Sequence, residues 1–212
     1  MARSGSWLAR RRRDGGGTAR PAAIAAPPGA RIVLHVGCGR IDEMGLHESY
    51  LGPEWHEVRL DVDPDVEPDI VASITDMSPV ADASVDAVYS HHNIEHVFAH
   101  EVSLVMAEFF RVLRPGGEVL LGTPDLQNVA RTIASGRLED PLYRSGAGRI
   151  TALDIVYGLR SDVADGREYM AHRTGFTRGT LARKLGAAGF VDIDVTRAHP
   201  FALWARARRP AA

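Results

Sequence analysis

The stretch IVLHVGCG, residues 32–39, decides the fold of this chain. Its first residues, up to Val36, form a short apolar run that is typical of a buried β-strand. Gly37 and Gly39 then let the backbone turn sharply, and they let a ligand approach the main chain without a Cβ in the way. Glycine turns are common, so this stretch by itself leaves a ligand site and a plain turn equally open.

Further strands and helices follow along the chain. Apolar runs predict strands at 58–62, 70–74, 85–90, 119–123, 191–195 and 202–207, and helical spacing predicts helices at 98–113 and 177–188. Strands separated by helices form a parallel sheet, whereas the last two strands are joined by a short loop and must be antiparallel. The sequence therefore predicts an α/β fold: a mostly parallel seven-stranded sheet with helices on both faces and a C-terminal antiparallel hairpin.

Composition divides the chain into an arm, one domain and a short tail. Residues 1–30 combine an arginine run, a glycine run and several prolines with little to bury, so we expect a disordered basic arm. Residues 31–207 form the domain, and residues 208–212 form the tail. Within the domain, residues 125–175 make a long insertion between the fifth strand and the last helix. Insertions of this kind often build a substrate lid.

Charge and composition exclude several classes of protein. The chain has 212 residues and a formal net charge of −2, but its first 30 residues hold six arginines and one acidic residue, so the remainder carries −7. An acidic domain argues against a nucleic-acid partner, and no apolar stretch is long enough for a membrane span. The single cysteine, Cys38, rules out an intrachain disulfide and fits a reducing compartment. We therefore expect a soluble, cytoplasmic protein.

A second chemical signal stands at the end of the second predicted strand. Asp61 lies 22 residues after Gly39, the spacing at which an acidic residue binds the ribose hydroxyls of a nucleotide-like ligand. A carboxylate suits this role because it accepts hydrogen bonds from two hydroxyls at once. Asp42 stands where a dinucleotide-binding loop has its third glycine, which disfavours a nicotinamide cofactor.

Taken in order, five stretches resemble the class I S-adenosylmethionine-dependent methyltransferases, in particular a branch of small bacterial methyltransferase domains. They are VLHVGCGR (33–40), RLDVDP (59–64), ADASVDAVYSHHNIEHV (81–97), FFRVLRPGGEVLLGTPDL (109–126) and AHRTGFTRGTLARKLGAAGF (171–190). The resemblance covers about residues 31–207. It implies a Rossmann-like domain with strand order 3-2-1-4-5-7-6 and S-adenosyl-L-methionine as the cofactor.

The resemblance also implies a cofactor site made of residues that follow the first four strands. They are Gly37, Cys38, Gly39, Asp61, Val62, Ser73, Ile74, Asp76 and His91. Asp61 would hold the ribose hydroxyls, and Val62 would pack on the adenine. The edge of the adenine is usually met by an acidic residue after the third strand. Here Ser73 stands at that place, which leaves either a weaker contact from Ser73 or a replacement by Asp76.

The segment HHNIEH, directly after the fourth strand, is rich in groups that move protons or bind metals. Imidazole titrates near neutrality, so His92 is our main candidate for a base, with His96 as a second catalytic candidate. The resemblance places His172 at the mouth of the crevice, which makes it a third. His92-x-x-Glu95-His96 also matches the H-x-x-E-H signature of a class of zinc peptidases, in which a helix carries both histidines. A structural role, in which Glu95 and His96 cap the following helix, stays equally open.

We therefore expect a methyltransferase that moves a methyl group from S-adenosylmethionine to an oxygen or nitrogen of a small-molecule or sugar-like acceptor. We expect no bound metal. The acceptor class follows from the acidic charge, the compact size and the lack of an added nucleic-acid module. Two alternatives stay open. One is a degenerate methyltransferase fold that binds without catalysis, and the other is the zinc peptidase, which needs stoichiometric zinc.

Overall fold

The computed structural model describes residues 24, 26–41 and 45–211. Most of the basic arm expected at 1–30 lies outside the described residues, and so does Asp42. The described part of the arm packs against the domain, because Ile24 and Ala26 contact the hydrophobic core. The packed domain therefore begins before Arg31, the residue at which the sequence predicted its start.

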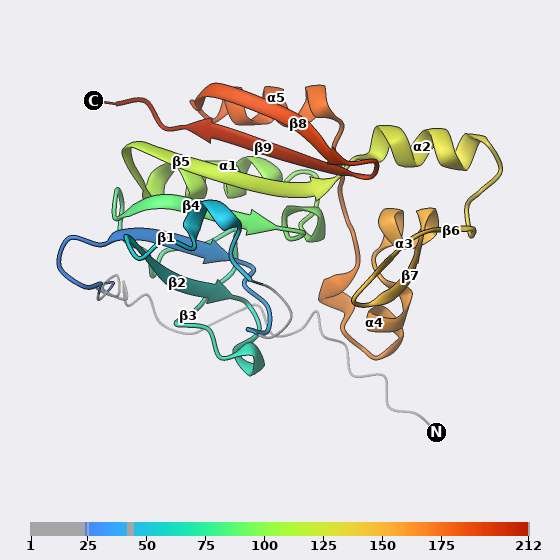
Figure 1. The fold of residues 1–212 in the computed structure, drawn as a ribbon, viewed down its shortest axis with the longest axis horizontal. Helices are drawn as coiled ribbons and strands as arrows, with labels where there is room; N and C mark the ends of the chain where they lie inside the picture. The colour runs from blue at the N-terminus through green and yellow to red at the C-terminus, as the bar shows by residue number, and fades with distance from the viewer. Residues whose placement is uncertain (1–23, 25, 42–44, 212) are drawn as a thin grey trace.

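One seven-stranded sheet forms the centre of the domain, in the order β3-β2-β1-β4-β5-β9-β8 (Figure 1). The strands are β1 (Arg31–Val36), β2 (Trp55–Asp61), β3 (Ile70–Val71), β4 (Val85–His91), β5 (Leu113–Pro124), β8 (Val191–His199) and β9 (Ala202–Arg208). The first five run parallel, and β9 is antiparallel to both β5 and β8. This is the expected order with the expected C-terminal hairpin, so the Rossmann-like fold is confirmed.

The two faces of the sheet are covered differently. Helices α1 (Val102–Val112) and α5 (Arg178–Ala187) bury side chains in the main core on one face. On the other face, Tyr50 of the short 3₁₀ helix η2 (Glu48–Tyr50) packs with Val33, Tyr89 and Leu120. Side chains alternate between faces along a strand, so these strand residues point away from α1. No helix among the described residues is long and apolar enough to cross a membrane.

Helix α1 starts later than the sequence predicted. The apolar spacing from Phe98 predicted a helix over 98–113, but the helix begins at Val102, with Glu101 as its N-cap residue. The Glu101 side chain accepts a hydrogen bond from the Phe98 backbone N–H at 3.0 Å, which holds these residues in a turn. Helix α5 was predicted well, because Thr177 and Thr180 form a capping box at its start.

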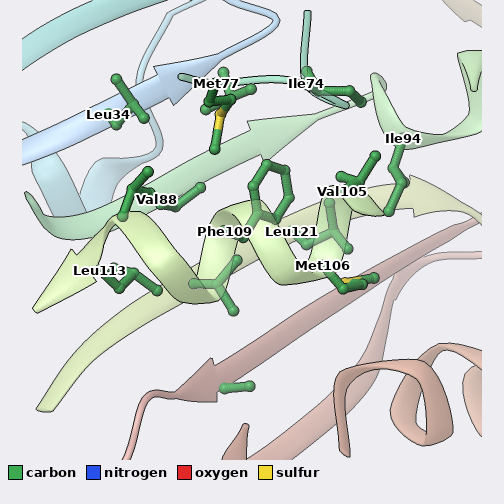
Figure 2. Close-up of a cluster of buried hydrophobic side chains, with 14 of the residues drawn as sticks. Leu34, Ile74, Met77, Val88, Ile94, Val105, Met106, Phe109, Leu113 and Leu121 are labelled. Carbon is green, nitrogen blue, oxygen red and sulfur yellow. The ribbon is translucent and has the colours of Figure 1, made fainter. Parts of the chain in front are cut away.

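The main core lies between α1 and the sheet. Figure 2 shows Phe109 and Met106 of α1 facing Leu34, Val88 and Leu121 of the strands, all of which are buried. Phe109 has no exposed surface, so it contacts other side chains on all sides. Packing of this density makes the core sensitive to the loss of one large side chain.

The insertion at 125–175 folds into its own small unit beside the sheet edge where the parallel strands end (Figure 1). Its elements are α2 (Leu126–Ala134), the hairpin β6 (Pro141–Ser145) and β7 (Gly148–Thr151), α3 (Ala152–Tyr157), α4 (Arg160–Ala164) and the 3₁₀ helix η5 (Glu168–Met170). A separate apolar cluster that includes Val129 and Ile155 holds α2, the hairpin and α3 together. The short helix expected near 153–159 is present as α3.

We predict that Phe109→Ala lowers the free energy of unfolding by about 3–5 kcal/mol, because it removes a fully buried aromatic side chain and leaves a cavity. Urea denaturation followed by circular dichroism measures the change. The matched control is Leu104→Ala on the same helix. Leu104 is 53% exposed, so its loss should cost less than about 1 kcal/mol. Equal losses for the two variants would contradict the core described above.

Candidate functional site

The chain turns at the carboxyl end of β1 as the sequence predicted. Gly37 and Gly39 have φ angles of +70° and +55°, in the left-handed region that glycine adopts without strain. A Cβ built on Gly37 would lie 2.4 Å from Cγ of Asn93, so a larger residue would collide with that side chain. Asn93 in turn donates a hydrogen bond to the Val36 carbonyl at 3.2 Å. The glycine turn therefore packs directly against the segment that follows β4.

Asp61, at the end of β2, is fixed against the glycine turn. Its carboxylate accepts hydrogen bonds from the backbone N–H groups of Gly39 at 2.9 Å and Asp63 at 3.0 Å. A carboxylate has about four lone-pair sites, so two remain for ligand hydroxyls. Val62 is next in the chain, and its apolar side chain is 56% exposed. A carboxylate, an exposed apolar side chain and a glycine turn fit the ribose, adenine and methionine parts of S-adenosylmethionine.

The other residues expected at the cofactor are placed less favourably. Cys38 is fully buried, and burial raises the pKa of its thiol to about 11, so it is protonated at neutral pH. Ile74 belongs to the hydrophobic core. Ser73 is hydrogen-bonded to the Thr75 hydroxyl, and the Asp76 carboxylate accepts from the Ser78 backbone N–H in an exposed turn. Both candidates for the edge of the adenine therefore make hydrogen bonds within their own turn, although the Asp76 carboxylate keeps lone pairs for a further partner.

His91 ends β4 and points toward β9. Its ring stacks on Trp204 with centroids 4.7 Å apart and an interplanar angle of 8°. A Cβ on Gly122 would lie 2.2 Å from His91 Cδ2, so glycine at 122 makes room for the ring. Burial, helped by the neighbouring His92, lowers the pKa of His91 to about 4. His91 is therefore a neutral packing residue on this side of the sheet edge.

His92 turns the other way. Its φ of +50° lies in the left-handed region, which is rare for a residue other than glycine and is often found at functional sites. Its Nδ1 lies 3.0 Å from a carboxylate oxygen of Glu95, and its side chain is 40% exposed. Burial lowers the pKa of His92, but the hydrogen bond and charge of Glu95 outweigh it, so the pKa is raised overall.

Glu95 is completely buried. Besides His92, its carboxylate accepts a hydrogen bond from the Thr123 hydroxyl of β5 at 3.1 Å. Burial raises the pKa of Glu95, but the hydrogen bond and charge of His92, with His96 and His172 nearby, bring it down to about 2. The group is therefore an ionised carboxylate. The structure shows that Glu95 lies at the centre of the histidine cluster. The sequence alone had left open whether Glu95 has a functional role or caps a helix.

His96 and His172 meet beside this carboxylate, although they are far apart in the sequence. Their ring centroids are 4.9 Å apart, and a side-chain ligand atom of each lies within 4.8 Å of a Glu95 oxygen. The backbone N–H groups of Arg173 and Thr174 donate to the Glu95 carbonyl at 2.8 and 3.1 Å. The structure thus gathers the three predicted catalytic histidines, 92, 96 and 172, around one buried acid.

The helix required by the zinc-peptidase alternative is not formed. His92 lies in the left-handed bend after β4, and His96 ends the 3₁₀ helix η4 (Ile94–His96). The next α-helix begins only at Val102, with Glu101 as its N-cap residue. His92 and His96 therefore do not share a helical face, which the zinc-peptidase alternative needs. Glu95 does not cap α1 either, so the capping role that the sequence left open for it is wrong.

Comparisons with known proteins point to the same family as the sequence. The methyltransferase-domain family matches residues 34–121, which run from β1 into β5 and include Asp61 and His92. Residues 34–121 are therefore identified as a methyltransferase domain, the domain that the sequence resembles. S-adenosylmethionine is accordingly its cofactor, as the resemblance in the sequence implied. No curated protein matches the chain significantly.

Solved structures of methyltransferases share the fold of this methyltransferase domain at low sequence identity. A 1,6-didemethyltoxoflavin N1-methyltransferase from Burkholderia thailandensis is 17% identical, with a TM-score of 0.53, over 85% of this chain and 72% of that one. A methyltransferase from Methanosarcina mazei is 19% identical, with a TM-score of 0.56, over 87% and 94%. One from Archaeoglobus fulgidus is 15% identical, with a TM-score of 0.55, over 85% and 86%. At these identities the likeness shows the fold.

We predict that Asp61→Ala in this methyltransferase weakens binding of S-adenosylhomocysteine, the product form of the cofactor, by about 1–3 kcal/mol. This is the scale for leaving polar groups without a partner at a buried site. Isothermal titration calorimetry measures it. Asp65→Ala, a change of an exposed acid four residues further on, is the control and should bind as the wild type does. Unchanged affinity in Asp61→Ala would mean that the ribose is held elsewhere.

We also predict that Cys38 in the folded protein resists alkylation by iodoacetamide at pH 8. The thiol is buried, and a pKa of about 11 leaves only about one molecule in a thousand as thiolate at that pH. Mass spectrometry gives a single readout, because the chain has one cysteine. Modification should become fast only in denaturant. Rapid modification of the native protein would contradict the buried placement.

Proposed function

We propose that the protein transfers a methyl group from S-adenosylmethionine to a hydroxyl oxygen or an amine nitrogen of a small-molecule or sugar-like acceptor. The observation that carries the proposal is the cluster of His92, His96 and His172 around Glu95, directly beside the glycine turn. A cytoplasmic location is part of the proposal, because Cys38 is a free thiol.

Contacts within the described residues connect the histidine cluster to the cofactor crevice. Strands β1 and β4 pair in parallel, with Val36 opposite Ser90, so both strands end at the same edge. Asn93 bridges the two ends, because its side-chain amide donates to the Val36 carbonyl and to the Ser90 hydroxyl. The acceptor is therefore expected between these strand ends and the segment that carries His172.

The insertion supplies the outer wall of this site. The Tyr169 hydroxyl donates to the Asp63 carboxylate at 2.9 Å, two residues from Asp61. His172 lies three residues further along the same segment and reaches the cluster at the end of β4. A wall attached at both places suits an acceptor of small size. The Burkholderia neighbour, whose structure holds bound 1,6-didemethyltoxoflavin, supports a small-molecule acceptor.

The bound cofactor supplies an activated methyl group on a sulfonium, whose carbon–sulfur bond breaks as the acceptor attacks and leaves S-adenosylhomocysteine. The protein positions the acceptor in line for this attack, which can account for much of the rate. Glu95 accepts a hydrogen bond from Nδ1 of His92, which orients the imidazole and leaves Nε2 to take a proton from the acceptor. A hydroxyl depends on such a base more than an amine does.

A degenerate fold that binds the cofactor without catalysis is the second candidate. The observation that favours it is that Ser73 and Asp76 both make hydrogen bonds within their own turn, so neither side chain is held in place by a bond outside that turn. Such a protein would bind S-adenosylhomocysteine and show no turnover. A screen with radiolabelled cofactor and a panel of small alcohols, phenols, amines and sugars separates the two candidates.

With an acceptor in hand, we predict that His92→Gln lowers kcat for a hydroxyl acceptor by about 10²–10⁴-fold, the usual contribution of a general base. The affinity for S-adenosylhomocysteine should stay within about twofold, because His92 is assigned to the acceptor side. His100→Gln, a change of an exposed histidine on the same loop, is the control and should leave kcat unchanged. A His92→Gln enzyme with wild-type kcat would remove the base from the mechanism.

A further inference from the structure

The cluster of Glu95, His96 and His172 has the composition of a metal centre. One potential ligand atom from each residue lies within 4.8 Å of the others. Two imidazoles and one carboxylate are a common ligand set for zinc and for other divalent transition metals in enzymes. Three protein ligands leave at least one coordination position open, as catalytic metal sites require.

The hydrogen bonds of the two histidines fix which nitrogen is available. Nδ1 of His172 lies 2.8 Å from the Ile155 carbonyl, and Nδ1 of His96 lies 3.3 Å from the Ala171 carbonyl. A carbonyl oxygen can only accept, so Nδ1 carries the hydrogen in both rings. In the neutral imidazole the lone pair then sits on Nε2. Histidine ligands of metals are characteristically held in this way, by a backbone carbonyl behind the ring.

The carboxylate is also oriented from behind. Its two oxygens accept hydrogen bonds from His92 and from the Thr123 hydroxyl, at 3.0 and 3.1 Å. Each carboxylate oxygen has two lone pairs, so these bonds leave capacity for a metal. Glu95 is fully buried, and a buried carboxylate whose remaining neighbours are two imidazole nitrogens is well prepared for a cation.

We propose that Glu95, His96 and His172 bind one divalent transition metal ion, such as Zn²⁺, which joins the insertion to the end of β4. With metal–ligand bonds of about 2.0–2.1 Å, tetrahedral ligand atoms stand about 3.4 Å apart. The gathered ligand atoms, within 4.8 Å of one another, therefore lie no more than about 1.4 Å farther apart than in such a site. This proposal replaces the expectation from the sequence that no metal is bound.

A group of the acceptor can bind the metal at the open coordination position. A hydroxyl oxygen bound to such a cation gives up its proton more easily, whereas an amine bound there has its attacking lone pair occupied by the metal. A second nearby oxygen would add a chelating contact. This step rests on the proposed function, since it assumes that the acceptor enters beside His92. The metal site itself does not depend on it. The substrate class it favours is a small alcohol or phenol with two neighbouring oxygens, rather than an amine.

The test uses the full chain, purified without a polyhistidine tag and stripped of metal with a chelator. Co²⁺ is titrated while visible absorption and calorimetry are recorded, and Zn²⁺ is then added as a competitor. We expect one Co²⁺ per chain, a ligand-field band in the visible region, and displacement by one equivalent of Zn²⁺. Removal of a ligand should weaken binding by about 100-fold or more, at least as much as the loss of a supporting contact does.

The variants are His172→Gln, His96→Gln and Glu95→Gln, with His100→Gln as the matched control on the exposed part of the loop. Far-ultraviolet circular dichroism and thermal unfolding show which variants keep the fold, and calorimetry with S-adenosylhomocysteine tests cofactor binding separately. We expect folded His172→Gln protein to lose Co²⁺ and His100→Gln protein to keep it. Wild-type protein that takes up no stoichiometric metal, or a folded His172→Gln protein that binds it equally well, would overturn the site. Metal binding with the expected variant pattern, but without S-adenosylhomocysteine binding, supports the site while removing the proposed methyl transfer.

Discussion

The buried carboxylate of Glu95 is the interaction on which the arrangement of the site depends. A charge inside a protein is stable only when hydrogen bonds and opposite charges replace its lost water. Here His92 and Thr123 bind the carboxylate, and the backbone N–H groups of Arg173 and Thr174 bind the carbonyl of the same residue. These partners come from the end of β4, from β5 and from the insertion. One buried acid therefore sets the relative positions of three segments.

The insertion is attached to the sheet by backbone as well as by side chains. Its two ends lie side by side, because Asp125 and Phe176 form a β-bridge. The Asp125 carboxylate caps α2 and pairs with Arg197 of β8, which adds at this base an ion pair whose carboxylate is buried. Farther out, Tyr169 reaches Asp63. Attachments at the base and farther out make the insertion a fixed wall, so its residues decide which acceptors fit.

The elements that the sequence predicted well are those with local signals. The buried strand before Gly37, the capped helix at Thr177 and the tight C-terminal hairpin each follow from neighbouring residues. The start of α1 was predicted wrongly, because the apolar Phe98 continued the helical pattern while Glu101 held its backbone in a turn. The hairpin of β6 and β7 was not predicted, since its first strand is largely exposed and lacks alternation.

The predictions for the site also depended on whether a residue carries a local signal in the sequence. Asp61 was found from its spacing to the glycine turn, whereas the pairing of His172 with Glu95 spans most of the domain and has no local signal. The adjacent residues His91 and His92 show why the residue type alone does not predict a functional role. Alternation along β4 sends His91 against Trp204, where burial lowers its pKa to about 4. The left-handed turn sends His92 back to the carboxylate, where its pKa rises. Two identical side chains one residue apart thus have opposite electrostatic surroundings, and only the backbone angle between them separates a packing residue from a candidate base.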